Sequence, residues 1–295
     1  MPGFMTKFVP SSEVGAVQPQ PGIWKLAIGL GALLLLCYWQ TISATAILLT
    51  ASEDMAHGFF APFIAGFLLW SNRDRLTTGL SEPSAWAVPL LALGALLAVP
   101  ASLGASTTIS RFGLLLSLAG VTLVLGGVPL LKAVRFPLAL LLYTFPIPGV
   151  LYGEITLPLQ LLASRLAEMS FEMLGYSVLR EGNIIELANQ KLSVVEACSG
   201  LRSLVTLSFF TAVYSYLMEN RNWVRALLVI VAIPAAILIN AMRITLTGVL
   251  GKINPAWTKG TVHDITGWVC FAIGFVIVLL IHLMVKRWTR KGKVG

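Results

Sequence analysis

Residues 265–285 read ITGWVCFAIGFVIVLLIHLMV and contain no Asp, Glu, Lys or Arg. A helix of about 17–25 predominantly apolar residues crosses the hydrocarbon core of a bilayer, so this stretch is long enough to span a membrane. Further runs without these charged residues precede it, at residues 26–52, 55–72, 83–110, 112–131, 136–153, 203–218 and 226–242. The sequence therefore predicts an all-α fold, a polytopic integral membrane bundle of about eight transmembrane helices.

The composition excludes a soluble globular enzyme. Hydrophobic residues make up 57% of the 295 residues and charged residues only 12%, whereas about a quarter of a soluble domain is charged. The net charge of +8 lies mainly between the apolar runs, so it indicates orientation in a membrane and no nucleic-acid partner. Neither a zinc-ligand spacing nor a nucleotide-binding motif occurs, and we expect no metal and no cofactor.

The basic residues predict the topology. The C-terminal tail, residues 286–295, carries its Lys and Arg directly after the last apolar run, and the positive-inside rule places such a tail in the cytoplasm. Counting back over an even number of helices places the N-terminal tail, residues 1–23, in the cytoplasm as well. Residues 154–197 then lie on the external face. We expect residues 1–295 to form a single membrane-embedded domain.

The external segment 154–197 differs from the rest of the chain. Residues 155–175 are apolar but carry Arg165, Glu168 and Glu172, which favours an interfacial helix. If this helix crossed the membrane instead, the positive-inside pattern would fail in one half of the chain. Residues 176–196 contain short β-branched runs separated by turn residues, which predict a small β-hairpin-like cap.

Three polar residues fall at the same predicted external rim of consecutive helices. Cys198 opens one helix, Arg243 ends the next, and His263 begins the last. The amino end of a helix and a nearby cation lower the pKa of a thiol and favour the reactive thiolate. Histidine can take and return a proton, and a fixed guanidinium can stabilise an oxyanion. The three residues therefore predict a cysteine-nucleophile site.

Each of these residues also has a structural interpretation. A lone cysteine in a membrane helix is usually inert packing, and an arginine at a helix end is often an interfacial anchor. His282, deep in an apolar run, is interpreted as structural. The functional reading rests on the three residues sharing one membrane face. Further candidates for supporting or substrate-binding roles are Arg202, Asn240, Glu196, Asp264 and His57.

These motifs resemble those of the exosortases, the bacterial branch of the exosortase/archaeosortase family of membrane cysteine transpeptidases. The block from Arg180-Glu181-Gly182-Asn183 through Val195-Glu196-Ala197-Cys198-Ser199-Gly200-Leu201-Arg202 is similar to the family's nucleophile region. The segment Asn240-Ala241-Met242-Arg243 is similar to its arginine motif, and His263-Asp264 with Gly267-Trp268 to its histidine motif. Weaker similarities are His57-Gly58 and Phe145-Pro146-Ile147-Pro148.

The resemblance implies a nucleophile at Cys198, an acid/base at His263 and a stabilising cation at Arg243. It implies exported substrate proteins that end in a Pro-Glu-Pro-type motif, a hydrophobic helix and a basic tail. It also implies a site on the external side of a bacterial inner membrane. A thioester acyl-enzyme would then be resolved by water or by an acceptor nucleophile, and the sequence leaves both open.

The residues alone also allow a different class of function. In a transporter or assembly factor for exported polysaccharide or lipid, Arg243, Arg202 and His263 would line an anion path. Cys198 would then be dispensable. A metalloprotease is disfavoured because no His-Glu-x-x-His motif is present.

Overall fold

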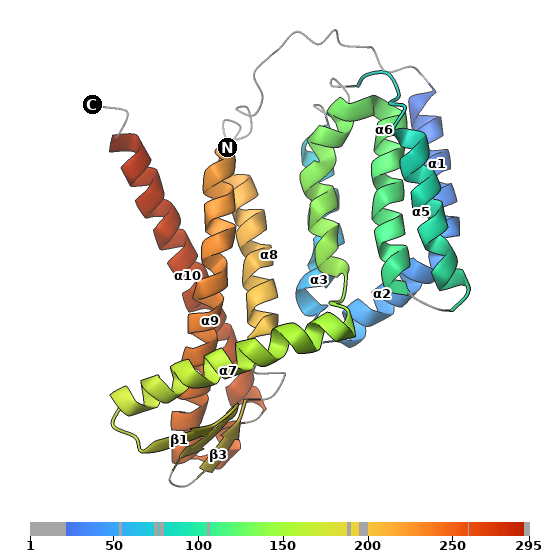
Figure 1. Ribbon diagram of the computed structural model, residues 1–295. Helices are drawn as coiled ribbons and strands as arrows, with labels where there is room; N and C mark the ends of the chain where they lie inside the picture. Colours follow the sequence, from blue (N-terminus) through green and yellow to red (C-terminus); the bar gives the residue numbers. More distant parts are fainter. Residues whose placement is uncertain are drawn as a thin grey trace. The chain divides into compact units, whose positions relative to one another are not determined.

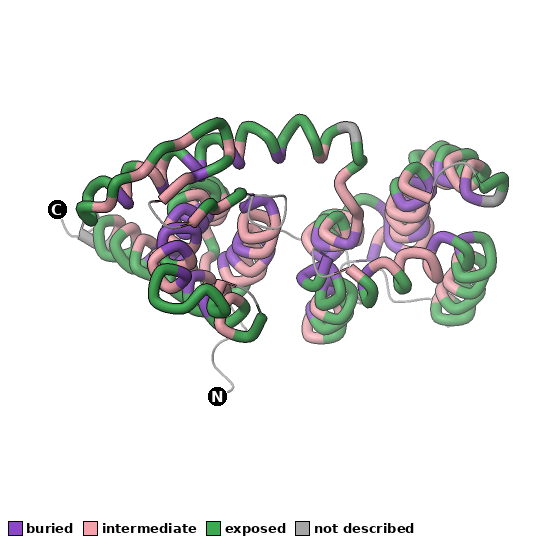
Figure 2. Tube along the Cα trace, turned by 90° about the horizontal axis from the view of Figure 1, so that it is seen from below, coloured by how far each residue is buried: buried purple, intermediate pink, exposed green. Residues whose placement is uncertain are grey.

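The computed structural model describes residues 22–52, 55–73, 76, 80–104, 107–187, 190–194, 200–258 and 260–291. The chain forms two compact units, Met1–Pro146 and Ile147–Gly295, and each is described here by itself (Figure 1). In both units, buried residues lie where helices face one another (Figure 2). The single domain expected from the sequence stays a prediction.

The first unit opens with a broken helix. The apolar run 26–52 forms α1 (Ile23–Cys37) and α2 (Trp39–Ala51), bent by 72° at Tyr38. The Tyr38 side chain is only 2% exposed. Its hydroxyl donates to the carbonyl of Gly94 at 2.6 Å and is hydrogen-bonded to Ser117 Oγ at 2.8 Å. Because a buried hydroxyl needs partners, these bonds hold the bend against the next helices.

The other elements among the described residues of this unit are α3 (Ala56–Ser71), α5 (Ala87–Ser102), α6 (Thr107–Leu140) and the short 3₁₀ helix η2 (Leu141–Thr144). Helices α5 and α6 pack closely through glycines. A Cβ atom on Gly94 would lie 2.8 Å from the carbonyl oxygen of Gly113, so a larger residue does not fit there. Small residues at such contacts are typical of membrane helix pairs.

The predicted helices 112–131 and 136–153 meet earlier in the chain than the charged residues that separate the two runs. Helix α6 breaks at Gly126 and Gly127, where the chain reverses direction (Figure 1). Gly127 has φ +64°, and a Cβ there would lie 2.5 Å from the carbonyl oxygen of Glu82. Both the left-handed conformation and the close approach require glycine. The charged residues Lys132 and Arg135 therefore lie inside the second limb of α6.

The second unit contains α7 (Gly149–Met173), α8 (Leu201–Met218), α9 (Asn222–Ile253), the 3₁₀ helix η4 (Pro255–Thr258) and α10 (Thr261–Lys291). Helices α8, α9 and α10 pack around one apolar core, which includes Leu207, Leu228, Ala232 and Val278. Helix α7 runs crosswise to these three helices (Figure 1).

Within the described ranges, four helices are long and apolar enough to cross a membrane, or five if α1 and α2 form one bent span. The four are Thr107–Thr144, Leu201–Met218, Asn222–Ile253 and Thr261–Thr289. Shorter apolar helices at Ala56–Ser71 and Ala87–Ala101, together with the reversal in α6, account for the remaining predicted runs. The predicted all-α, polytopic membrane fold is confirmed. Helix α7 is not among these spans, and its place at the interface stays a prediction.

The predicted cap is present, but it has three strands where a hairpin was expected. Strands β1 (Val178–Glu181), β2 (Ile184–Leu187) and β3 (Gln190–Ser193) form an antiparallel sheet in the order β1-β2-β3. One face packs on α7 and α9 through Phe171, Ile185, Val194 and Ile244. The third strand is held on α9 by a hydrogen bond from Gln190 Nε2 to the carbonyl of Gly248, 2.6 Å long, which the sequence pattern did not reveal.

Helix α7 also begins earlier than expected, directly after Pro148.

Candidate active site

Three cationic or titratable side chains of the second unit lie close together. Arg202 is in the first turn of α8, and His263 is in the first turn of α10. The prediction that Arg243 ends its helix is wrong: α9 continues to Ile253, since the first proline after Arg243 is Pro255. Both guanidinium groups act electrostatically on the His263 imidazole. The structure thus brings Arg202, Arg243 and His263 from three different helices to one place.

The Arg243 side chain lies beside Gly267 of α10. A Cβ atom on Gly267 would lie 3.9 Å from Nη1 of Arg243, so the guanidinium lies over α10 one turn after His263. Arg243 is half-buried. Its charge also acts electrostatically on the thiol of Cys270, which is one turn further along α10. The guanidinium of Arg243 is therefore directed at the face of α10 that begins with His263.

Asn240 lies one turn before Arg243 and is 1% exposed. Its side chain packs against Gly200, where a Cβ atom would lie 2.9 Å from Asn240 Nδ2. Gly200 has φ +87° and is the residue before the first residue of α8. The backbone entering α8 therefore contacts the arginine-bearing helix at this point. Gly200 is required here for two reasons, the left-handed conformation and the close approach.

His263 offers a buried ring nitrogen to this site. Its Nδ1 atom is buried and has no hydrogen-bond partner among the described residues. The neighbouring Asp264 is exposed and acts electrostatically on the same ring. A neutral imidazole carries one donor and one acceptor nitrogen, so His263 can exchange a proton with a reacting group.

Of the remaining predicted site residues, two are not described and one belongs to the first unit. Cys198 and Glu196, with the prediction that Cys198 opens a helix, fall outside the described residues; α8 itself begins at Leu201. His57 belongs to the first unit, in the first turn of α3, and is 5% exposed. Its ring lies edge-on to Tyr143, with the ring centroids 6.2 Å apart. The structure shows His57 as a buried residue of its own unit.

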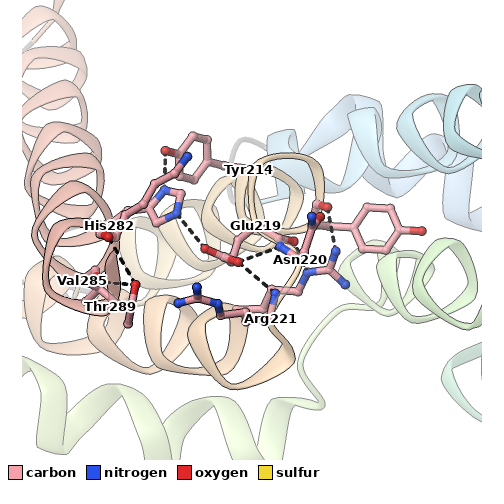
Figure 3. A network of polar contacts seen from close by, with 10 residues as sticks. Tyr214, Glu219, Asn220, Arg221, His282, Val285 and Thr289 are labelled. Atoms are coloured by element: carbon pink, nitrogen blue, oxygen red, sulfur yellow. Dashed lines mark hydrogen bonds and ion pairs between the residues drawn. The ribbon is translucent and has the colours of Figure 1, made fainter. Parts of the chain in front are cut away.

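A polar network at the other end of α8 was not predicted from the sequence (Figure 3). The hydroxyl of Tyr214 is 2.7 Å from Nδ1 of His282, and Nε2 of His282 is 3.3 Å from Glu219 Oε2. The other carboxylate oxygen of Glu219 accepts the backbone N–H groups of Asn220 and Arg221. One carboxylate thus joins the end of α8, the start of α9 and α10. His282 is thus buried and makes polar contacts on both ring nitrogens, and its structural role stays a prediction.

The charge of Glu219 fixes the tautomer of His282. Burial alone would raise the pKa of Glu219, but hydrogen bonds from the Arg221 and Asn220 N–H groups and from His282 outweigh it, so the pKa lies below its usual value. An ionised carboxylate only accepts hydrogen bonds, and His282 Nε2 must therefore carry the proton. In the neutral imidazole, the Tyr214 hydroxyl then donates to Nδ1. The contact between Glu219 and His282 could not be predicted from the sequence, because the two residues are 63 positions apart.

Arg111 separates two uncharged runs of the sequence and is 4% exposed inside the first unit. Its Nε donates to Thr45 Oγ1 at 2.8 Å. A hydroxyl group of the neighbouring helix α2 thus binds this buried charge of α6.

No group of three or more His, Cys, Asp or Glu side chains with a metal-binding arrangement occurs among the described residues. The free cysteines described are Cys37, which is exposed, and Cys270, which is buried. The side chains that meet in this unit thus contribute two guanidinium groups, which can bind negative charge, and one imidazole, which can transfer a proton.

Comparison with known protein families gives one finding. A family model with the description Transmembrane exosortase (Exosortase_EpsH) matches residues 39–280. No curated protein and no solved structure matches the chain. The matched range includes all the residues that form the site.

Proposed function

Because the chain belongs to the transmembrane exosortase family, we propose that it is a membrane-embedded cysteine transpeptidase acting on the C-terminal sorting signals of exported proteins. Family membership supports the class of membrane transpeptidase. The observation that carries the proposal further is the convergence of Arg202, Arg243 and His263 at the start of α8. The segment with Cys198 directly precedes this helix in the sequence.

The proposed reaction proceeds through a thioester. The Cys198 thiolate attacks the scissile carbonyl carbon, and Arg243 stabilises the oxyanion that forms. The C–N bond then breaks as His263 gives a proton to the leaving amine. The N-terminal part of the substrate stays on Cys198 as an acyl group. Water or an acceptor nucleophile next gives a proton to His263, attacks the thioester and releases the thiolate.

The proposed substrate carries a Pro-Glu-Pro-type motif, a hydrophobic helix and a basic tail. Such a helix would lie beside the enzyme in the membrane, with its basic tail in the cytoplasm and its motif at the external rim. A carboxylate in the motif would be attracted to Arg202 or Arg243. This arrangement requires the site on the external side of a bacterial inner membrane, with both termini of the enzyme in the cytoplasm.

Co-expression with a tagged substrate tests the proposal. An immunoblot should show a smaller or modified substrate with the wild-type chain and with Cys37→Ala, which removes an exposed thiol. Cys198→Ala and Cys198→Ser should leave the substrate unprocessed, although both variants reach the membrane. Equal processing by all four proteins would contradict a thiol mechanism. A transporter or assembly factor would also tolerate the near-isosteric serine.

A further inference from the structure

The three-stranded sheet has two edges, and their hydrogen-bonding groups follow from its register. Val194 N–H donates to the carbonyl of Asn183 at 2.9 Å, so that pair is hydrogen-bonded. Antiparallel pairs alternate between bonded and non-bonded, and Ile184↔Ser193 and Glu186↔Lys191 are therefore non-bonded pairs. The N–H and C=O groups of Lys191 and Ser193 consequently point away from β2, along the outer edge of β3.

This edge of β3 is open. Lys191 and Ser193 are both exposed, and no hydrogen bond among the described residues uses their backbone groups. The Lys191 side chain lies on the solvent-facing side of the sheet, where it pairs with Glu186. The edge thus presents two N–H donors and two C=O acceptors to a further strand.

Strand β3 is held firmly on the helix that carries Arg243. Besides the bond from Gln190 to Gly248, the Leu192 side chain packs so closely that a Cβ on Gly248 would lie 2.7 Å from its Cδ1. Val194, directly after the strand, is 1% exposed in the cap core. The open edge is therefore in a fixed position relative to α9.

The sequence distinguishes the two edges of the sheet. Ser193 at the end of β3 is followed five residues later by Cys198, a distance of at most about 18 Å for an extended chain. The opposite edge, β1, leads back to α7, and its Arg180 is bound to Glu168 of that helix at 2.6 Å. Only the edge of β3 continues into the nucleophile segment.

We propose that the outer edge of β3 binds an extended segment of the substrate polypeptide as an added strand. This inference rests on the proposed function, because it assigns the peptide substrate of that site a docking surface. Strand addition binds the peptide through backbone groups and so accepts many sequences. The short strand and the edge lysine oppose pairing with untethered chains. A substrate anchored in the same membrane has a high effective concentration and can use so small an edge.

Proline variants test the edge. Ser193→Pro removes an outward N–H and no hydrogen bond of the sheet, and substrate processing should fall about tenfold, roughly the effect of one lost hydrogen bond. Val178→Pro is the control at the opposite edge, and Val178→Ala accounts for the lost packing of this side chain on the cap core. Val178 lies in a non-bonded pair with Leu187 and its proline variant loses an outward N–H from the other edge, so processing should stay near the wild-type level. Equal losses in both proline variants, or none in either, would overturn the inference.

A photo-crosslinker gives a readout that does not need proline or turnover. With Cys198→Ala as background, benzoylphenylalanine at Lys191 should capture the substrate near its sorting motif, whereas the same group at the exposed Leu179 of β1 should not. Processing by the wild type without capture at position 191 would overturn the docking surface and leave the transpeptidase standing. Capture at position 191 with processing that does not depend on Cys198 would support the edge and contradict the thiol mechanism.

Discussion

Gly200, two residues after the proposed nucleophile Cys198, contacts helix α9, which carries Arg243. It combines φ +87° with a neighbour, Asn240 Nδ2, only 2.9 Å from a Cβ position. Neither property follows from the sequence, because both depend on how closely α8 approaches α9. That Arg243 and His263 lie near each other was predictable, because helix length and the charge pattern place both residues toward one end of consecutive helices. The position of Arg243 within its helix was not, because α9 continues beyond it to Ile253.

Gly200→Ala should abolish processing while the protein still reaches the membrane. A left-handed non-glycine residue costs about 1–2 kcal/mol, and the methyl group must also displace Asn240. Gly182→Ala is the control, since Gly182 has φ +64° in the β1–β2 turn with nothing within 4 Å of its Cβ position. If the two variants process substrate equally well, the Gly200–Asn240 contact has no role in the site.

Glu219 predicts a pH dependence of stability. Its folded-state pKa is depressed, so its stabilising contacts are fully present above the ordinary carboxyl pKa of about 4.3 and are lost as the pH falls through the lower folded value. Glu219→Ala should therefore lower the stability at neutral pH by roughly 1–3 kcal/mol, and the difference from the wild type should shrink in acid. Thermal unfolding in detergent at several pH values measures this, with the exposed Glu154→Ala as control. A difference that grows in acid would contradict the sign.

The lengths of the apolar runs predicted most of the helices, but they did not predict where the chain bends or reverses within a run. The break in α6 lies at Gly126 and Gly127, between apolar residues, where charge patterning gives no signal. The bend at Tyr38 also lies inside an uncharged run. In both cases the cause is tertiary: a close approach to residues 81–82 in the first, and hydrogen bonds to α5 and α6 in the second.

Gly127→Ala should destabilise the turn within α6. The variant would need φ +64° and would place its methyl group 2.5 Å from the carbonyl oxygen of Glu82, so we expect a loss above the 1–2 kcal/mol or so of the conformation alone. Gly104→Ala, with φ +72° and open space, should show only that smaller loss. Thermal unfolding of the two variants in detergent measures the difference, and equal losses would contradict the close approach.

For the whole molecule, the charge pattern predicts which parts face each side of the membrane, and labelling can test it. In a cysteine-free background, Glu181→Cys on the exposed side of the cap should react with an impermeant maleimide added to the external side of the membrane. Lys286→Cys in the basic tail should react only after the membrane is opened. The reverse pattern would place the cap inside and contradict the predicted topology.

The proposed mechanism requires a covalent intermediate at Cys198. Enzyme isolated after expression with substrate should carry the N-terminal part of that substrate on the peptide that contains Cys198, detected by mass spectrometry. Neutral hydroxylamine should release it, because thioesters are cleaved under these conditions, and Cys198→Ala should show no adduct. Efficient processing by Cys198→Ala, or a substrate adduct on another residue, would contradict the account.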